Sequence, residues 1–211
     1  MAESGQEEWI VVWQEGRRRL EDDAVFGPWV REIGPVEVPA DDVAPFAYLT
    51  RAVCFQQLAG AAARTIHGRV VEAVGGTVDP ASVLRAPEED LRAAGLSRSK
   101  LKAIRDLASK IRSGTVVVDD LDEQPDEEVV RRLTTVWGIG EWTAQMYLMF
   151  RLHRPDVWPV ADLGVRQGYA RARGLDDPPS AKELAPMGEA YRPWRSAVAY
   201  YCWRILETEL P

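Results

Sequence analysis

The chain has 211 residues, enough for one domain or two small lobes around a real hydrophobic core. Its composition contains no run near the about 18 apolar residues of a membrane span, and its acidic start, residues 1–8, is unlike a signal or transit peptide. The net charge of −7 argues against tight coating of nucleic acid, because nonspecific affinity for DNA comes mainly from neutralising phosphates. We therefore expect a cytoplasmic protein.

Helical patterns fill the first half of the chain. Residues 46–74 form a long helical run, broken or bent near Gly60 and stopped by Gly75 and Gly76. Two prolines begin short helices over 80–86 and 87–94. The next helix has apolar residues at helical spacing and stops at Gly114. Its apolar positions are Leu101, Ile104, Leu107 and Ile111.

The second half of the chain is also predicted to be helical. Acidic residues at 126–128 favour a helix start, residues 157–159 form a connector, and residues 174–179 form a loop. A final amphipathic helix is expected from Pro193 to about Glu207. Only residues 36–38 and 116–118 suggest strand, and both segments are too short to build a sheet. The sequence therefore predicts an all-α fold.

The two cysteines, Cys54 and Cys202, lie far apart within apolar helical patterns. Two buried, reduced thiols are the expected arrangement in a reducing compartment. Two cysteines cannot ligate a four-cysteine iron–sulfur cluster. The sequence therefore excludes such a cluster.

The most informative segment is a glycine hairpin between two helical patterns. Residues 133–144 read LTTVWGIGEWTA, and residues 159–162 read PVAD. Gly138 and Gly140 allow positive φ and a close approach to the backbone. The amides between Gly140 and Thr143 lie at the start of the second helix, where they have no partner inside the helix and form an anion site. A DNA phosphate is the expected anion.

Four sequence blocks carry a resemblance to a known family. They occur in order at residues 56–58 (QQL), 95–100 (GLSRSK), the hairpin with Asp162, and 193–196 (PWRS). The chain, over roughly residues 20–207, resembles the helix-hairpin-helix/GPD DNA glycosylases and is most similar to their 3-methyladenine DNA glycosylase II group. The resemblance implies a single glycosylase core over residues 1–211, with the hairpin motif at 133–151. It also implies two helical lobes flanking a catalytic cleft, without the N-terminal β domain of larger relatives.

The resemblance assigns catalysis to Asp162. A carboxylate beside C1′ stabilises positive charge on the sugar or orients the attacking water. Spacing alone favours a helix cap at this position, and the two roles are compatible. Bifunctional relatives have a lysine where this chain has Trp142, and tryptophan cannot form a Schiff base. The sequence therefore predicts a hydrolytic, monofunctional enzyme without lyase activity.

The resemblance also assigns a base pocket and a wedge. Trp142, Met146 and Trp203 line the pocket, where aromatic faces stack on a flipped, electron-poor base. Leu58 fills the gap in the duplex, beside Gln56 and Gln57. Core packing is the alternative for Leu58 and for the two tryptophans. Core packing is the preferred interpretation for the other six tryptophans, which are Trp9, Trp13, Trp29, Trp137, Trp158 and Trp194.

The hairpin and one loop are expected to hold the DNA backbone. The amides of Gly138, Gly140 and Thr143 hold a phosphate, and Arg98 and Lys100 contact the other strand or form a solvated loop. By the same resemblance, the carbonyls of three hairpin residues hold a structural Na⁺ or K⁺. These residues are Thr134, Val136 and Ile139.

The sequence thus predicts a monofunctional glycosylase of base excision repair that removes 3-methyladenine and 7-methylguanine after base flipping and leaves an abasic site. Its partner is double-stranded DNA containing alkylated bases, with no membrane and no organic cofactor. A monomer is expected, associated with the nucleoid in a prokaryote. Two alternatives remain open. One is a noncatalytic module that recognises damaged DNA, and the other is a glycosylase for deaminated or oxidised bases.

Overall fold

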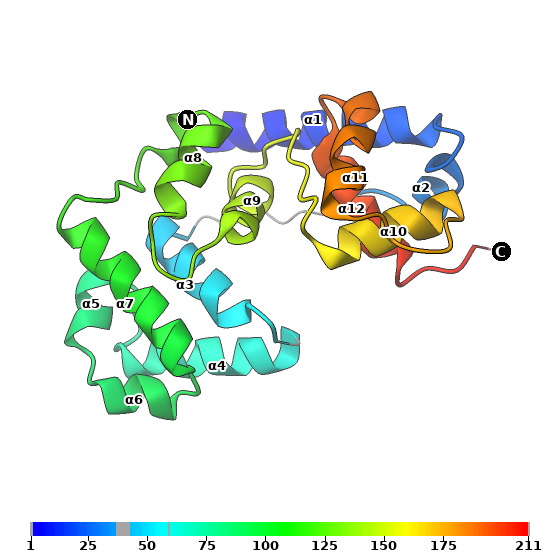
Figure 1. Cartoon of the computed structure of the whole chain (residues 1–211). Coiled ribbons are helices and arrows are strands. Elements are labelled where there is room, and N and C mark those ends of the chain that lie inside the picture. Colours follow the sequence, from blue (N-terminus) through cyan, green and yellow to red (C-terminus); the bar gives the residue numbers. More distant parts are fainter. Residues whose placement is uncertain (1, 37–42, 59, 211) are drawn as a thin grey trace. The chain divides into compact units, whose positions relative to one another are not determined.

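The structure, a computed structural model, describes residues 2–36, 43–58 and 60–210, with side chains from residue 12 onward. All regular structure in these ranges is helical, and no strand occurs in them (Figure 1). The all-α prediction is therefore confirmed.

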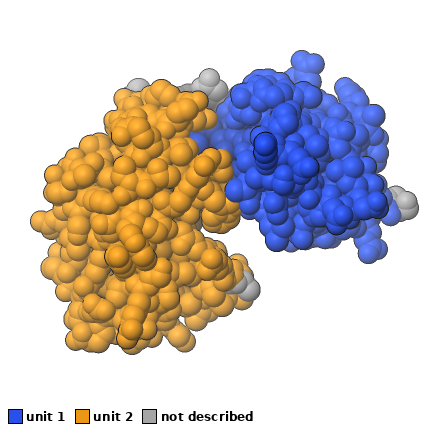
Figure 2. All heavy atoms as spheres, viewed as in Figure 1, with its two compact units in different colours: residues 1–40, 148–211 blue, residues 41–147 orange. Residues whose placement is uncertain are grey.

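The chain forms two compact units, residues 1–40 with 148–211 (unit 1) and residues 41–147 (unit 2), coloured separately in Figure 2. Unit 1 contains α1 (Ala2–Glu21), α2 (Gly27–Ile33), α10 (Leu163–Arg173), α11 (Ala181–Met187), the 3₁₀ turn η2 (Glu189–Tyr191) and α12 (Arg195–Ile205). Unit 2 contains α3 (Pro45–Phe55), α4 (Gly60–Ala73), α5 (Pro80–Arg85), α6 (Glu88–Ala93), α7 (Arg98–Arg112), the 3₁₀ turn η1 (Leu121–Glu123) and α8 (Asp126–Leu133). The helix α9 (Glu141–Phe150) begins in unit 2 and ends in unit 1.

The helices predicted in the middle of the chain are confirmed, with small shifts at their ends. The long run over 46–74 is two helices, α3 and α4, and the break begins at Gln56 rather than at Gly60. Gly75 and Gly76 follow α4 with φ of 85° and 92°. Gly114, with φ of 73°, ends α7, because a left-handed residue cannot continue the helix. The final helix is shorter than predicted and spans Arg195–Ile205.

Among the described residues, the two segments that suggested strand contain no strand. Residues 116–118 are irregular, and Val116 and Val118 are buried in unit 2. Val36 is buried, whereas residues 37 and 38 lie outside the described residues. Val117, between the buried Val116 and Val118, is 47% exposed.

Side-chain caps fix where several helices begin. The Asp79 carboxylate accepts from Ser82 N–H at 2.8 Å, and Ser82 Oγ accepts from Asp79 N–H at 3.0 Å, which makes a capping box at α5. Ser180 and Glu183 form the same reciprocal pair at α11. The Ser97 hydroxyl accepts from Lys100 N–H at the start of α7. These caps satisfy amides that the helices themselves leave unpaired.

Unit 1 has an aromatic core in which α10 and α12 make the closest approach. Phe26 lies between Tyr169 and Tyr191, with ring centroids 6.0 and 5.5 Å away. A Cβ on Gly168 would lie 1.9 Å from the carbonyl oxygen of Cys202. Only glycine therefore allows the two helix backbones to meet at this point.

Unit 2 has an aliphatic core built around α7. Leu101, Ile104 and Leu107, which carry the predicted helical period, are all buried. They share the interior with Leu49, Val53, Leu91, Leu96, Leu121, Val129 and Leu133. Tyr48 and Tyr147 pack edge to face at 5.4 Å. The core thus joins α3 and α7 to the helix that leads into the hairpin.

The tryptophan predictions are partly confirmed. Trp13, Trp29 and Trp158 are buried as expected, and Trp194 is half-buried. The prediction is wrong for Trp137, which is 42% exposed on the hairpin with the Lys102 ammonium 4.1 Å from its ring centroid. The side chain of Trp9 lies outside the described side chains.

Among the described residues, no helix has the length and hydropathy needed to cross a membrane.

Both cysteines are free and buried, as predicted. Burial raises the pKa of the Cys54 thiol to about 11, and it also raises the pKa of Cys202. Only the thiolate reacts as a nucleophile, so both groups are inert at neutral pH.

We therefore predict that a maleimide or disulfide reagent at pH 8 labels neither cysteine in the native protein. At this pH about one in a thousand Cys54 thiols is ionised, and neither sulfur is exposed. The measurement is intact mass after timed labelling, with protein unfolded in guanidinium as the positive control. Rapid labelling of the folded chain would contradict the prediction.

Candidate active site and nucleic-acid interface

Asp162 is the N-cap of α10 in unit 1. Its Oδ1 atom accepts from Val165 N–H at 2.8 Å, so the capping role considered from spacing is present. The same oxygen accepts from the indole N–H of Trp203 at 2.9 Å. Two donors therefore orient this half-buried carboxylate.

Trp203 reaches Asp162 because α10 has a glycine at its second position. A Cβ on Gly164 would lie 2.7 Å from Trp203 Cδ1 and 3.1 Å from Asp162 Oδ1. The Trp203 indole also packs against Phe150. The two ring centroids lie 5.7 Å apart at an interplanar angle of 35°. The indole predicted to line the base pocket is thus packed against an aromatic ring and hydrogen-bonded to the predicted catalytic aspartate.

The hairpin in unit 2 connects α8 to α9 over residues 134–140. Gly138 has φ of 80°, and a Cβ there would lie 2.9 Å from Ala103 Cβ on α7. Of the two hairpin glycines that allow positive φ, Gly138 adopts it and Gly140 does not. A Cβ on Gly140 would meet nothing within 4 Å, so the backbone at the start of α9 is open to an approaching phosphate.

Side chains of α7 hold the hairpin in place. Asp106 Oδ2 accepts from Trp137 N–H at 2.7 Å and from Lys110 Nζ at 2.8 Å. Lys110 Nζ also donates to the carbonyl of Thr135 at 2.6 Å. Although burial raises the pKa of Asp106, these hydrogen bonds hold that pKa below its ordinary value. The hairpin is therefore fastened on its N-terminal side by one charged pair.

A groove of about 480 Å³ in unit 2 gathers several residues of the predicted DNA interface. We call it the hairpin groove. Its lining residues come from the turn after α3, the start of α7 and the start of α9, and they are Gln56, Gln57, Ser97, Ser99, Lys100, Trp142 and Thr143. Sequence reasoning assigned no role to Ser97 and Ser99, although both lie within the GLSRSK block.

The two long side chains of Gln56 and Lys100 in this groove donate to acceptors within the protein. Gln56 Nε2 donates to the carbonyl of Gly138 at 3.2 Å and to Thr143 Oγ1 at 3.0 Å. Lys100 Nζ donates to the carbonyl of Cys54 at 2.8 Å, and partial burial lowers the pKa of this ammonium. Sequence reasoning placed both side chains against DNA, and the structure instead gives each of them an internal hydrogen bond.

The predicted wedge and pocket side chains are accessible. Leu58 is 41% exposed and Trp142 is 39% exposed, which rules out core packing for both. Met146 is half-buried one helical turn after Trp142 on α9. Trp142 and Met146 belong to unit 2, whereas Asp162 and Trp203 belong to unit 1.

The carbonyl groups proposed for a monovalent cation belong to hairpin residues, of which Thr134 is exposed and Val136 and Ile139 are buried. Ile139 N–H donates to the carbonyl of Val136 at 3.1 Å, which leaves this oxygen one further lone pair. Carbonyl oxygens of Thr134, Val136 and Ile139 are hard ligands of the type that Na⁺ and K⁺ accept. The donor set therefore fits such a cation in its chemistry.

Two arginines of the helices α7 and α10 donate to backbone carbonyls. Arg105 donates to the carbonyl of Ala86, and Arg171 donates to the carbonyls of Leu206 and Thr208. Arg98 is exposed at the first position of α7. Lys100 donates to the carbonyl of Cys54, and the Lys102 ammonium lies over the ring of Trp137.

An acidic side chain stands at the predicted phosphate site. Glu141 is exposed in the first turn of α9, and its Oε1 accepts from Gln145 Nε2 at 3.1 Å. A carboxylate at this position is favoured by the helix dipole but repels a phosphate bound to the same amides. Sequence reasoning did not consider this residue.

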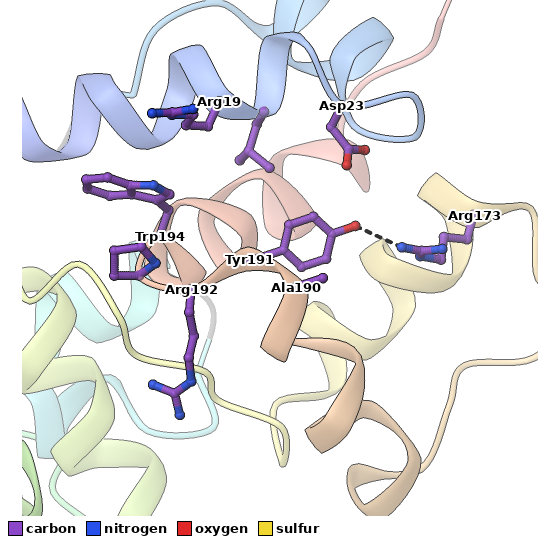
Figure 3. A pocket seen from close by; sticks show the side chains of 9 residues that line it. Arg19, Asp23, Arg173, Ala190, Tyr191, Arg192 and Trp194 are labelled. Carbon is purple, nitrogen blue, oxygen red and sulfur yellow. Dashed lines mark hydrogen bonds between the residues drawn. The ribbon is translucent and has the colours of Figure 1, made fainter.

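A pocket of about 550 Å³ in unit 1 does not contain Asp162. Figure 3 shows Arg19, Arg192 and Arg173 around Tyr191, whose hydroxyl accepts from Arg173 at 2.8 Å. Arg19 pairs with Glu15, and Arg192 pairs with Glu189 and Asp156. Each arginine already has a partner, so this pocket is not the candidate active site.

A helix-hairpin-helix followed by an aspartate that caps the next helix is typical of one class of DNA-repair proteins. A sequence profile of the HhH-GPD superfamily, base excision DNA repair proteins, matches residues 50–192. The chain belongs to the HhH-GPD superfamily of base excision DNA repair proteins.

Several known proteins similar to this chain are named 3-methyladenine glycosylases. DNA-3-methyladenine glycosylase 1 of Schizosaccharomyces pombe is 34% identical over 163 residues, which are 76% of this chain and 72% of that protein. The solved structure of the S. pombe 3-methyladenine DNA glycosylase Mag1 with abasic DNA has a TM-score of 0.85 at 29% identity, covering 93% of this chain and 98% of that one. The structure of a DNA-3-methyladenine glycosidase from Bacillus halodurans has a TM-score of 0.77 at 33% identity, covering 90% and 87%. These findings confirm the resemblance seen in the sequence motifs.

We predict that Gly164→Ala slows base release from methylated duplex DNA by about tenfold, because the added methyl displaces Trp203 from Asp162. Single-turnover release of free base measures the effect. Gly68→Ala is the matched control, since a Cβ at this position in α4 meets nothing within 4 Å. Equal rates for the two variants would contradict the prediction.

We also predict that Glu141→Gln tightens binding to undamaged duplex by about threefold at low salt, because a like charge leaves the phosphate site. The gain should disappear at high salt. Fluorescence anisotropy at two salt concentrations measures it. The control is Glu127→Gln, in the first turn of α8, and an equal gain there would point to net charge alone.

Proposed function

We propose that this protein is a monofunctional DNA glycosylase that hydrolyses the N-glycosidic bond of alkylated purines in duplex DNA. The substrates proposed are 3-methyladenine and 7-methylguanine, and the product is an abasic site. The observation that carries the proposal is the Asp162 carboxylate, oriented by Val165 N–H and by the Trp203 indole.

Hydrolysis requires stabilisation of positive charge on the deoxyribose. As the C1′–N bond breaks, its electron pair leaves with the base and neutralises the cationic purine. Water forms the new bond to C1′ and loses a proton. The role proposed for Asp162 is to stabilise the sugar cation and to orient or deprotonate that water. No second acid is required, because an alkylated base is already a good leaving group.

The absence of lyase chemistry is proposed from the residue at position 142. A bifunctional glycosylase attacks C1′ with an amine and forms a Schiff base. Trp142 has no amine, and its exposed indole is suited instead to stack on a flipped base. The thioether of Met146, one turn further along α9, gives a polarisable wall to such a pocket.

The names of similar proteins support this choice of substrate. The S. pombe relative is named a DNA-3-methyladenine glycosylase, and the solved S. pombe complex contains abasic DNA, which is the product that such an enzyme leaves. We extend the same substrate class to this chain. We also propose that the hairpin carbonyls hold a Na⁺ or K⁺ beside the bound phosphate and that the protein acts as a monomer.

The test is release of free bases from methylated duplex DNA by wild type and by Asp162→Asn, with strand nicking scored before and after alkali. We expect release by wild type, a loss of at least about 100-fold in the variant, and nicks only after alkali. Asparagine retains the helix cap, so the loss would report chemistry rather than unfolding of α10.

The matched control is Asp79→Asn, which makes the same replacement at the N-cap of α5. Equal losses at positions 79 and 162 would contradict a chemical role for Asp162. Binding of damaged duplex without any base release would support a noncatalytic recognition module, and faster release of hypoxanthine or uracil would reverse the substrate ranking.

A further inference from the structure

The turn that carries the predicted wedge is weakly held by its own backbone. Gln56 leaves the helical conformation with ψ of 129°, and Gln57 has φ of 55°, a conformation that costs energy for a residue other than glycine. The local hydrogen bonds are long. The Gln56 nitrogen lies 3.4 Å from the carbonyl oxygen of Val53, and the Leu58 nitrogen lies 3.3 Å from the carbonyl oxygen of Phe55. An exposed leucine in this turn therefore needs support from elsewhere.

Gln56 supplies that support from within unit 2. Its single Nε2 atom donates to Gly138 O in the hairpin and to Thr143 Oγ1 in the first turn of α9. A primary amide has two N–H groups, so both bonds can form together, and the carbonyl acceptor at Gly138 fixes which end of the amide faces the hairpin. Thr143 is only 3% exposed, so its hydroxyl is a fixed acceptor.

Lys100 contacts the end of α3 immediately before the same turn. Its ammonium donates to the carbonyl of Cys54 in the last turn of α3, where a positive charge complements the helix dipole. Cys54 itself is fully buried. The end of α3 is thus fastened to the start of α7 by Lys100 and to the hairpin by Gln56.

We infer that Gln56 is a positioning residue that joins the Leu58 wedge to the phosphate-holding hairpin, so that wedge and anchor enter the duplex as one rigid piece. This inference rests on the proposed function. Base flipping costs unstacking and unpairing energy, and a wedge held in place beforehand does not have to be ordered at the same moment. Gln56 thereby acts through Leu58 and does not read DNA bases.

The first test is Gln56→Met, which keeps the length of the side chain and removes both hydrogen bonds. We expect single-turnover base release to slow by about tenfold, while affinity for undamaged duplex stays within about twofold. The matched control is Gln124→Met, which removes an amide hydrogen bond of 3.0 Å to Asp120 elsewhere in unit 2. A fall in duplex affinity as large as the fall in rate would show that Gln56 contacts DNA and would overturn the inference.

A double-mutant cycle separates positioning from a general loss of stability. If Gln56 acts through the wedge, Gln56→Met adds less than about twofold to the defect of Leu58→Ala. Full additivity would overturn the inference. Should Gln56→Met fail to fold, Thr143→Val removes one acceptor without altering the turn, and the same non-additivity with Leu58→Ala is expected.

A binding measurement keeps this inference distinct from the proposed enzyme activity. We would place 2-aminopurine beside an abasic-site analogue in a duplex and record its fluorescence at saturating protein. Wild type should raise the signal by inserting Leu58, and Gln56→Met should reduce that rise at full occupancy. A rise in wild type without base release from methylated DNA would contradict the proposed function alone. An equal rise in both proteins would contradict only the role of Gln56.

Discussion

The first turn of an α-helix leaves backbone amides without partners, and this constraint applies to one helix start in each unit. At α10 one of these amides is satisfied from within the protein, because the Asp162 carboxylate accepts from Val165 N–H. At α9 the backbone of Gly140 is open, and we propose that a DNA phosphate supplies the missing acceptor. The same property of helices therefore fixes a carboxylate in unit 1 and prepares an anion site in unit 2. Asp162 also shows that a cap and a proposed catalytic group can be one side chain.

Close packing around glycine determines how these groups are held. Gly168 allows α10 to approach α12 at Cys202, and Gly164 leaves room for the Trp203 indole beside Asp162. Gly138 lets the hairpin lie against Ala103 of α7. In each place a methyl group would meet a neighbouring atom at 2.9 Å or less. The orientation of the proposed reactive group thus depends on the packing of α10 against α12.

Several basic side chains are engaged in hydrogen bonds within the protein, which limits the positive charge available to attract DNA. Four basic side chains donate to backbone carbonyls and so stabilise the fold, namely Lys100, Lys110, Arg105 and Arg171. Glu141 brings a negative charge to the start of α9. With a net charge of −7, such a protein gains little from long-range attraction to DNA. On the proposed function, recognition relies on local contacts at the hairpin and at Leu58, which makes rigid placement of both more important.

The sequence by itself determined the all-helical fold, the helix-hairpin-helix, the position of Asp162 and the family, because helical periodicity, glycine spacing and short motifs are local properties of the chain. It also led to the prediction of Leu58 as a wedge and Trp142 as a pocket residue, and only the structure shows that both side chains are exposed. Tertiary structure alone decided that Trp203 donates to Asp162, that Gln56 and Lys100 turn inward, and that Asp106 and Lys110 hold the hairpin. These contacts join residues from 25 to 82 positions apart. No local pattern encodes such pairs, since a long polar side chain has the same sequence signature whether it meets solvent, DNA or a distant carbonyl.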